Sequence, residues 1–345
     1  MKMHMLARIA LPLAAALLAG GVQAKEFTLR VHHFLPTTST IHAKLLVPWC
    51  DKLAKDSAGR LKCQIFPAMQ LGGTPPQLFD QAKDGVADVT WTLLGYSAGR
   101  FPLIEVFELP FMIGSAEAAS KAVWEYSQTY AAAEYKDVKP LAFHTHEAGY
   151  FFLNKRPVTQ LADLRGLKLR APTRIANKTL AALGATPVGM PVPQVGESLS
   201  KGVIDGALLP YEVVPALRIQ EVTKFASETD PAVPALYTSV FMIAMNKAKY
   251  ESLPPDLKKI VDANSGLALS AWGGRIYDEA RAPGRKAVEA QGNAINTIPA
   301  AELARWRQAT DRIDDEWVAD VGRKGHDGKR LIEAARALIA KHVKR

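Results

Sequence analysis

The stretch Gly166-Leu167-Lys168-Leu169-Arg170-Ala171-Pro172 decides the fold class and the expected place of a binding site. Its apolar and basic residues alternate strictly, which is typical of a β-strand. The strand is expected to stop at Ala171-Pro172, because proline cannot extend a central ladder. Arg170 therefore lies at the carboxyl end of a strand, where open α/β sheets bind their ligands. Its guanidinium could hold a carboxylate through two parallel hydrogen bonds; the alternative is a surface arginine in a weak ion pair.

Strand-like and helix-like segments alternate along the N-terminal part of the chain. The expected strands are Phe27–His32, Leu61–Phe66 and Ala87–Trp91, and the expected helices are Ile41–Lys55 and Pro75–Lys83. Strands that alternate with helices indicate a parallel sheet whose strands are joined by crossover connections. The predicted fold class is therefore α/β.

The chain partly repeats this pattern at an offset of 117 residues. Each copy has a glycine-containing turn, a Pro-Gln helix start, a helix that ends at glycine, and a Val-x-Asp entry into a strand. Two similarly built α/β lobes would explain the repeat, and the alternative is coincidence among common turn residues. The matching residues are Ala68, Gly72, Pro76, Gln77, Gly85, Val86 and Asp88 in the first copy and Ala185, Gly189, Pro193, Gln194, Gly202, Val203 and Asp205 in the second.

Two strand-like segments, Gly149–Asn154 and Tyr237–Asn246, are expected to carry the chain from one lobe to the other. Two such connections make a hinge, with a ligand crevice between the lobes. The expected division is lobe I (25–148 and 239–273), lobe II (149–238 and 274–325) and a C-terminal helical tail (326–345).

The C-terminal third of the chain has a largely helical pattern. The segment Pro254–Gln291 is expected to be interrupted at Gly273-Gly274 and broken at Pro283. A further helical segment, Ala301–Val343, is expected to break at Gly325 and Gly328.

The first 24 residues are expected to be a signal peptide. Lys2 and Arg8 precede or flank a short apolar run, Ile9–Leu18, and Val22-Gln23-Ala24 has the small residues of a cleavage site. The run is too short to span a bilayer comfortably. The remaining 321 residues (345 minus 24) are expected to leave the cytoplasm for the periplasm and not to be embedded in the membrane.

The composition is ordinary for a soluble globular protein, with 22% charged and 48% hydrophobic residues. Without Lys2 and Arg8 the formal net charge falls from +9 to +7. This charge is spread rather than gathered into a basic stripe, which argues against nucleic-acid binding. A mild positive field favours small anionic solutes.

The two cysteines, Cys50 and Cys63, flank an expected helix-to-strand turn, 56–60. In an oxidising compartment they could form a disulfide, and the alternative is two buried free thiols. A closed zinc site made from these two residues alone is not expected, because such sites need four ligands.

Five short motifs are distributed along the chain: Pro67-Ala68-Met69-Gln70-Leu71-Gly72, Lys83-Asp84-Gly85-Val86-Ala87-Asp88, Glu108-Leu109-Pro110-Phe111, the segment Asp163–Pro172, and Gly202-Val203-Ile204-Asp205-Gly206. Together they resemble the periplasmic solute-binding proteins of tripartite ATP-independent periplasmic (TRAP) transporters, the DctP-like family. The resemblance extends to about residue 325. It implies a two-lobe periplasmic binding protein with two mixed sheets, hinge strands and a long lobe-spanning helix. It also implies TRAP membrane subunits as partners and no cofactor.

The resemblance implies that Arg170 forms a salt bridge with the carboxylate of the ligand. Sialic-acid-binding members have a second arginine at the position of Tyr150, asparagine at those of Phe34 and Leu209, and an acidic residue at that of Leu93. The apolar and aromatic residues of this chain would leave sugar hydroxyls without partners, at a cost of about 1–3 kcal/mol each. The expected ligand is therefore a flat aromatic monocarboxylate: benzoate-like, hydroxybenzoate-like or an aryl 2-oxo acid. An aliphatic 2-oxo acid or a dicarboxylate is the alternative.

The predicted ligand-binding set combines the residues at matching positions with others expected near the cleft. It comprises Arg170, Tyr150, Phe34, Gly73, Thr92, Leu93, Thr173, Val192, Leu209, Tyr211 and His33.

His144 and His146 lie on one face of an expected strand, and Glu147 follows. They suggest a metal-dependent enzyme as a second hypothesis, but no third ligand can be identified, and solvated or core histidines are the simpler interpretation. Sequence motifs of nucleophile elbows, dinucleotide sites, phosphate loops and zinc proteases are absent. A binding protein rather than an enzyme is therefore expected, and a sensor role is a third alternative.

Overall fold

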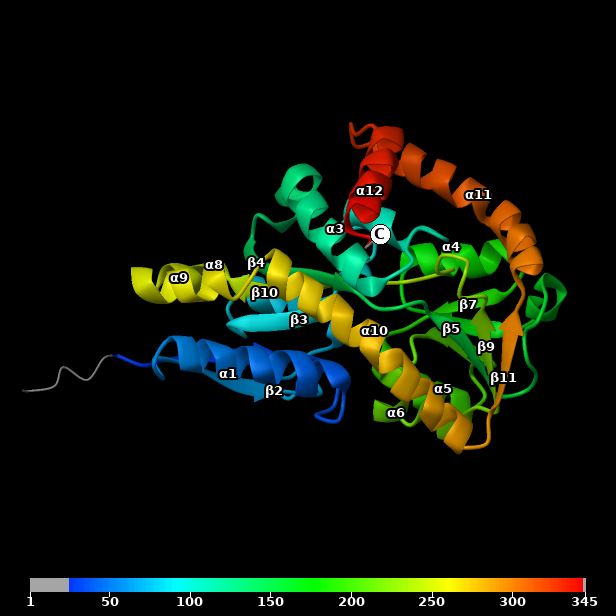
Figure 1. Cartoon of the computed structure of the whole chain (residues 1–345), viewed down its shortest axis with the longest axis horizontal. Helices are drawn as coiled ribbons and strands as arrows, with labels where there is room; N and C mark the ends of the chain where they lie inside the picture. The colour runs from blue at the N-terminus through cyan, green and yellow to red at the C-terminus, as the bar shows by residue number, and fades with distance from the viewer. Residues whose placement is uncertain (1–24, 344–345) are drawn as a thin grey trace, which may run out of the picture.

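Two mixed β-sheets form the frame of the molecule (Figure 1). The computed structural model describes residues 25–343, so the predicted signal peptide, residues 1–24, lies outside the described residues. The first sheet has the strand order β2 (Leu61–Phe66), β1 (Phe27–His32), β3 (Val89–Leu93), β10 (Val240–Asn246) and β4 (Val138–Thr145). The second has the order β11 (Ala294–Ile298), β9 (Phe225–Thr229), β5 (Tyr150–Leu153), β8 (Gly206–Leu209), β6 (Lys168–Ala171) and β7 (Thr186–Gly189).

Helices connect and cover the strands of both sheets (Figure 1). They are α1 (Val47–Asp56), α2 (Leu78–Lys83), α3 (Ala116–Tyr130), α4 (Arg174–Ala182), α5 (Val195–Ser200), α6 (Val213–Ala216), α7 (Ile219–Val222), α8 (Lys247–Glu251), α9 (Pro255–Ala263), α10 (Leu267–Ala290), α11 (Ala300–Gly322) and α12 (Gly328–His342). Shorter 3-10 turns include 75–77 and 104–108, and a π-helical turn at 42–46 leads into α1. The helix predicted over Ile41–Lys55 therefore begins with a wider turn than expected.

One strand in each sheet runs against its neighbours. In the first sheet β1 is parallel to β2 and β3, whereas β10 is antiparallel to β3 and β4. In the second sheet β5 is antiparallel to β8 and β9, and the other pairings are parallel. β5 follows β4 of the first sheet, and β10 follows β9 of the second. The antiparallel strands are thus the first strands after two of the passages between the sheets, and a third passage leads from β10 through α8, α9 and α10 to β11 of the second sheet.

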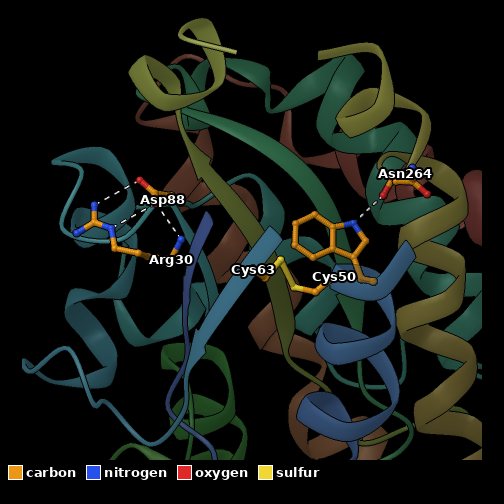
Figure 2. The surroundings of a disulfide bond; sticks show 6 residues. Arg30, Cys50, Cys63, Asp88 and Asn264 are labelled. Atoms are coloured by element: carbon orange, nitrogen blue, oxygen red, sulfur yellow. Dashed lines mark hydrogen bonds and ion pairs between the residues drawn. A yellow bond between two sulfur atoms is a disulfide. The ribbon is translucent and has the colours of Figure 1, made fainter. Parts of the chain in front are cut away.

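The two copies of the sequence repeat make the same backbone contact. Asp88 accepts a hydrogen bond from the backbone N–H of Arg30 (2.8 Å), and Asp205 accepts one from that of Lys168 (2.9 Å). The backbone N–H of each aspartate in turn donates to the carbonyl of the same partner, Arg30 or Lys168. Each aspartate therefore ties the start of its strand to a neighbouring strand of the same sheet. Figure 2 shows this contact for Arg30 and Asp88.

The prediction that the helical segment breaks at Gly273-Gly274 and Pro283 is wrong. Helix α10 runs without interruption from Leu267 to Ala290 and passes alongside both sheets (Figure 1). The glycines allow close packing instead of ending the helix. A Cβ at Gly273 would lie 2.9 Å from His144 Cγ, and one at Gly274 would lie 2.3 Å from the carbonyl oxygen of Ala116. By contrast, of the breaks predicted at Gly325 and Gly328, the one at Gly325 lies between α11 and α12, and Gly328 is the first residue of α12.

Cys50 of α1 and Cys63 of β2 are joined in a disulfide, with their Cα atoms 5.7 Å apart (Figure 2). The bond links α1 to the edge strand that it covers. Close by, the Trp49 indole donates a hydrogen bond to the carbonyl oxygen of Asn264 (2.9 Å), which ties α1 to the end of α9. Within residues 25–343, no helix is both long and apolar enough to cross a membrane.

Candidate functional site

A small central cavity is lined by residues from both sheets. About 350 Å³ of space lies between its lining atoms, including space that is open to solvent. Leu93 ends β3, Leu209 ends β8, and Arg170 is the penultimate residue of β6. The cavity therefore lies at carboxyl ends of strands, where α/β sheets bind ligands. Its lining comprises Phe34, Leu35, Trp91, Leu93, Tyr96, His146, Arg170, Pro172, Val192, Leu209, Pro210, Glu212, Val213, Tyr237, Ser239, Phe241 and Tyr277.

Arg170 is the cation among these lining residues, and its residue is only 1% exposed. Its Nε donates to the carbonyl of Met190 and its Nη1 to the carbonyl of Leu208, each at 3.0 Å. These two bonds fix the plane of the guanidinium. Its Nη2 is buried without a hydrogen-bond partner. Within residues 25–343, no carboxylate forms an ion pair with Arg170. A buried cation with an unpartnered nitrogen is prepared for an anionic acceptor, because an unpaired buried charge is costly.

Stacked aromatic rings form one wall of the cavity. The Trp91 ring lies 4.8 Å from Phe241 at an interplanar angle of 6°, and 4.7 Å from Phe34 at 24°. The ring of Tyr277 lies 5.9 Å from Phe241 and nearly parallel to it. Tyr96 packs against Phe34 at 5.6 Å. Such a wall offers flat apolar surface, which suits an aromatic or other apolar group.

Three further polar residues border the cavity. His146 Nε2 and Ser239 Oγ are buried without hydrogen-bond partners. Burial lowers the pKa of His146 to about 3, so its imidazole is neutral at physiological pH. Burial raises the pKa of Glu212 to about 7. The lining therefore holds one permanent positive charge and one carboxyl group that ionises only reluctantly.

The structure brings five residues of the predicted set to the cavity and leaves six outside its lining. Arg170, Phe34, Leu93, Val192 and Leu209 line it. The other six, for which the structure gives different surroundings, are Tyr150, Tyr211, Thr92, Thr173, Gly73 and His33.

The side chains of Thr92, Tyr211 and Tyr150 lie away from the cavity. Successive side chains of a strand point to opposite faces, so Thr92 lies on the face of β3 opposite to Trp91 and Leu93. Tyr211 lies between Pro210 and Glu212, which line the cavity, and its ring packs instead against Tyr150 at 5.2 Å. Tyr150 borders a separate groove, where the Arg281 guanidinium lies 5.3 Å from the centre of its ring.

His33, Gly73 and Thr173 take part in local contacts or turns outside the cavity lining. His33 uses both ring nitrogens within the fold, accepting from the Leu35 N–H (3.3 Å) and bonding to His42 (3.0 Å). Gly73 lies in an exposed turn with φ of +80°, where a Cβ would meet the Gln81 side chain. Thr173 caps α4 and borders an open groove that shares Tyr96 and Pro172 with the cavity.

The most prominent residues missed by sequence reasoning are aromatic. Trp91 could have been found, because it lies two positions before Leu93 on the same strand and so faces the same side. Phe241, Tyr237 and Tyr277 gave no local signal, since only the folded chain brings them beside β3.

His144 and His146, the residues of the metal-site alternative, have different surroundings in the structure. His144 Nε2 accepts a hydrogen bond from the Trp91 indole N–H at 2.8 Å, so this nitrogen is already engaged. No group of three or more His, Cys, Asp or Glu side chains among residues 25–343 is arranged to hold a metal ion. His146 instead belongs to the lining of the central cavity.

A family model described as bacterial extracellular solute-binding protein, family 7 (DctP), matches residues 31–320. Among similar solved structures is a TRAP solute-binding protein from Rhodoferax ferrireducens in complex with copurified benzoate. It is 52% identical with a TM-score of 0.91, and the match covers 92% of this chain and 98% of that one.

Two further solved structures carry aromatic acids. A marine metagenome TRAP solute-binding protein, specific for aromatic acid ligands, was crystallised with 3-hydroxybenzoate; it is 44% identical with a TM-score of 0.91, over 93% of this chain and 100% of that one. A TRAP protein from Bordetella bronchiseptica, with bound (R)- and (S)-mandelate, is 30% identical with a TM-score of 0.84, over 91% of this chain and 99% of that one.

Proposed function

This chain belongs to the DctP family of bacterial extracellular solute-binding proteins, and we propose that it is the receptor of a TRAP uptake system for an aromatic monocarboxylate. The ligand class is a benzoate-like or hydroxybenzoate-like acid or an aryl 2-oxo acid. Affinity would come from one charge-assisted clamp and from burial of an aromatic ring, without a covalent step.

The free Nη2 of Arg170 carries this proposal. Two carbonyl acceptors already hold the guanidinium in place, so the third nitrogen needs no reorientation to meet a carboxylate oxygen. A rigid cation loses little entropy on binding. The aromatic wall formed by Phe34, Trp91 and Phe241 would then contact the ring of the ligand.

The charges of the lining disfavour a dicarboxylate. Arg170 is the one permanent cation among the lining residues, because His146 remains neutral. A second ligand carboxylate would therefore lack a counter-charge, and Glu212 would repel it when ionised. The bound benzoate, 3-hydroxybenzoate and mandelate in the similar structures support the same ligand class.

We infer the location and partners from the family and from the N-terminal residues. An extracellular solute-binding protein with a signal peptide at residues 1–24 would work in the periplasm and deliver its ligand to TRAP membrane subunits. The proposed lobes are 25–148 with 239–273 and 149–238 with 274–325. Their closure over the cavity is supported by the two crossing strands, β5 and β10.

A panel of carboxylates tests the function. Benzoate, 3-hydroxybenzoate, phenylpyruvate, pyruvate, succinate and sialic acid would be compared by thermal shift and then by calorimetry on the protein freed of copurified ligand by denaturation and refolding. The aromatic acids are expected to bind at least tenfold more tightly than the others. A clear preference for succinate, pyruvate or sialic acid would refute the aromatic assignment. Conversion of any acid to product, followed by chromatography, would favour the enzyme alternative.

A further inference from the structure

The central cavity presents a free hydrogen-bond acceptor in addition to the free donor of Arg170. His146 is 1% exposed, and its Nε2 is buried without a partner. A buried polar atom left unpaired costs roughly 1–3 kcal/mol, so an unpaired atom that borders a cavity calls for an explanation.

The other ring nitrogen determines the chemical character of Nε2. Nδ1 of His146 forms a hydrogen bond with the carbonyl oxygen of Glu147. A carbonyl oxygen can only accept, so Nδ1 must carry the proton. Because the imidazole is neutral, Nε2 then has a lone pair and no hydrogen. His146 can therefore accept a hydrogen bond at this atom but cannot donate one to a carboxylate.

His144, two residues earlier on the same face, shows how the fold normally satisfies such an atom. Nε2 of His144 accepts from the Trp91 indole N–H at 2.8 Å. No residue of β3 does the same for His146, since β3 ends at Leu93 and the cavity begins there. Tyr237 packs against His146 with ring centres 4.9 Å apart but forms no hydrogen bond with Nε2, and the Ser239 hydroxyl is itself unpartnered.

We infer that His146 Nε2 accepts a hydrogen bond from a hydroxyl group of the ligand, so that the site selects hydroxylated aromatic acids over unsubstituted ones. This specificity rests on the proposed function, because it presupposes an aromatic acid held by Arg170. Arg170 and His146 would bind different groups of the ligand. Arg170 offers N–H to the carboxylate, whereas His146 offers a lone pair that repels carboxylate oxygen and attracts O–H. The ligand can then bind in one orientation only.

Ligand pairs that differ by one hydroxyl provide the first measurement, on the wild-type protein. Calorimetry would compare benzoate with 2-, 3- and 4-hydroxybenzoate, and phenylacetate with mandelate. The ring and side-chain hydroxyls are the two sources that these pairs distinguish. At least one hydroxylated acid should bind about fivefold to tenfold more tightly than its parent. The methoxy analogue of that acid, which cannot donate, should lose the gain. Equal affinities across all pairs would overturn the inference.

Substitution of His146 provides the second measurement. His146→Phe keeps an aromatic ring and removes the acceptor, so the ratio between the affinities for the hydroxylated acid and for benzoate should fall to about one. His146→Gln places an amide oxygen near the position of Nε2 and should retain most of the preference. An unchanged preference in His146→Phe would also overturn the inference. If no aromatic acid binds the wild-type protein, the proposed function itself fails, and this outcome is distinct from a lost hydroxyl preference.

Discussion

Replacement of Arg170 by methionine should abolish tight ligand binding while leaving the unliganded fold nearly as stable. Methionine has a similar length and no charge. Removal of one partner from a buried, hydrogen-bonded charge pair costs about 2–5 kcal/mol, which corresponds to a loss of affinity from about 30-fold to several thousand-fold. The loss should fall on every carboxylate ligand, because Nη2 of Arg170 is the donor that each would use.

The unliganded variant should be little affected, for a reason visible in the contacts of Arg170. Within the described residues Arg170 has no carboxylate partner, so its removal leaves no buried anion unpaired. The carbonyls of Met190 and Leu208 each lose one donor, at about 1 kcal/mol apiece, and relief of the buried positive charge offsets this cost. At a ligand concentration 1,000 times the wild-type dissociation constant, the wild type gains about 4.1 kcal/mol from the ligand, whereas the variant should gain only about 0.1–2 kcal/mol.

Arg174 provides a matched control four positions along the chain. Its guanidinium pairs with Glu105 and Asp320, and it borders the open groove rather than the central cavity. Arg174→Met should keep the ligand affinity but reduce stability by about 3 kcal/mol or more, since the buried Glu105 would lose its partner. Calorimetry and urea unfolding of both variants measure the two effects. Binding by Arg170→Met within threefold of the wild type would show that the carboxylate lies elsewhere.

Two further predictions concern stability. Burial raises the pKa of Glu108 from 4.5 to about 8, so the stability that it contributes is complete below pH 4.5 and is lost as the pH rises through 8. The unfolding free energy of the wild type minus that of Glu108→Gln should therefore decrease between pH 5 and 8, by at most about 1.4 kcal/mol per unit, and a constant difference in urea titrations would contradict this. The Cys50–Cys63 disulfide closes a loop with a sequence separation of 13, so Cys50→Ser/Cys63→Ser should lose about 2–3 kcal/mol with unchanged ligand affinity. Reductant should then destabilise the wild type but not the double variant.

Local patterns sufficed for much of the secondary structure. The predicted strands Phe27–His32 and Leu61–Phe66 coincide with β1 and β2, because alternation over six residues is a local property of the chain. The helix break predicted at Gly273-Gly274 was wrong because the role of these glycines is not a local property of the chain. Their role depends on the surfaces that α10 meets, and no property of the neighbouring residues reveals those surfaces.

In the candidate site too, residues placed by local sequence could be predicted, and residues brought together by strand pairing could not. The position of Arg170 followed from a strand and the proline after it, both readable within seven residues. The aromatic wall did not follow, since Trp91 and Phe241 are separated by 150 positions and meet only because β10 pairs with β3. The sequence could have excluded Thr92 from the site, because successive side chains of a strand point to opposite faces and Leu93 already faces the cavity.

The internal repeat indicates which segments line the cavity, and no single motif does so. Addition of the offset of 117 to Leu93 and Tyr96 gives Pro210 and Val213, and all four residues line the cavity. Each copy thus contributes residues at or just after the end of the strand that follows its Val-x-Asp motif, β3 in one sheet and β8 in the other. Gly73 precedes the helix of its copy rather than following its strand, and it lies outside the lining. The proposed ligand site therefore lies where equivalent segments of the two copies line one cavity, and Arg170 adds the positive charge that a bound carboxylate would need.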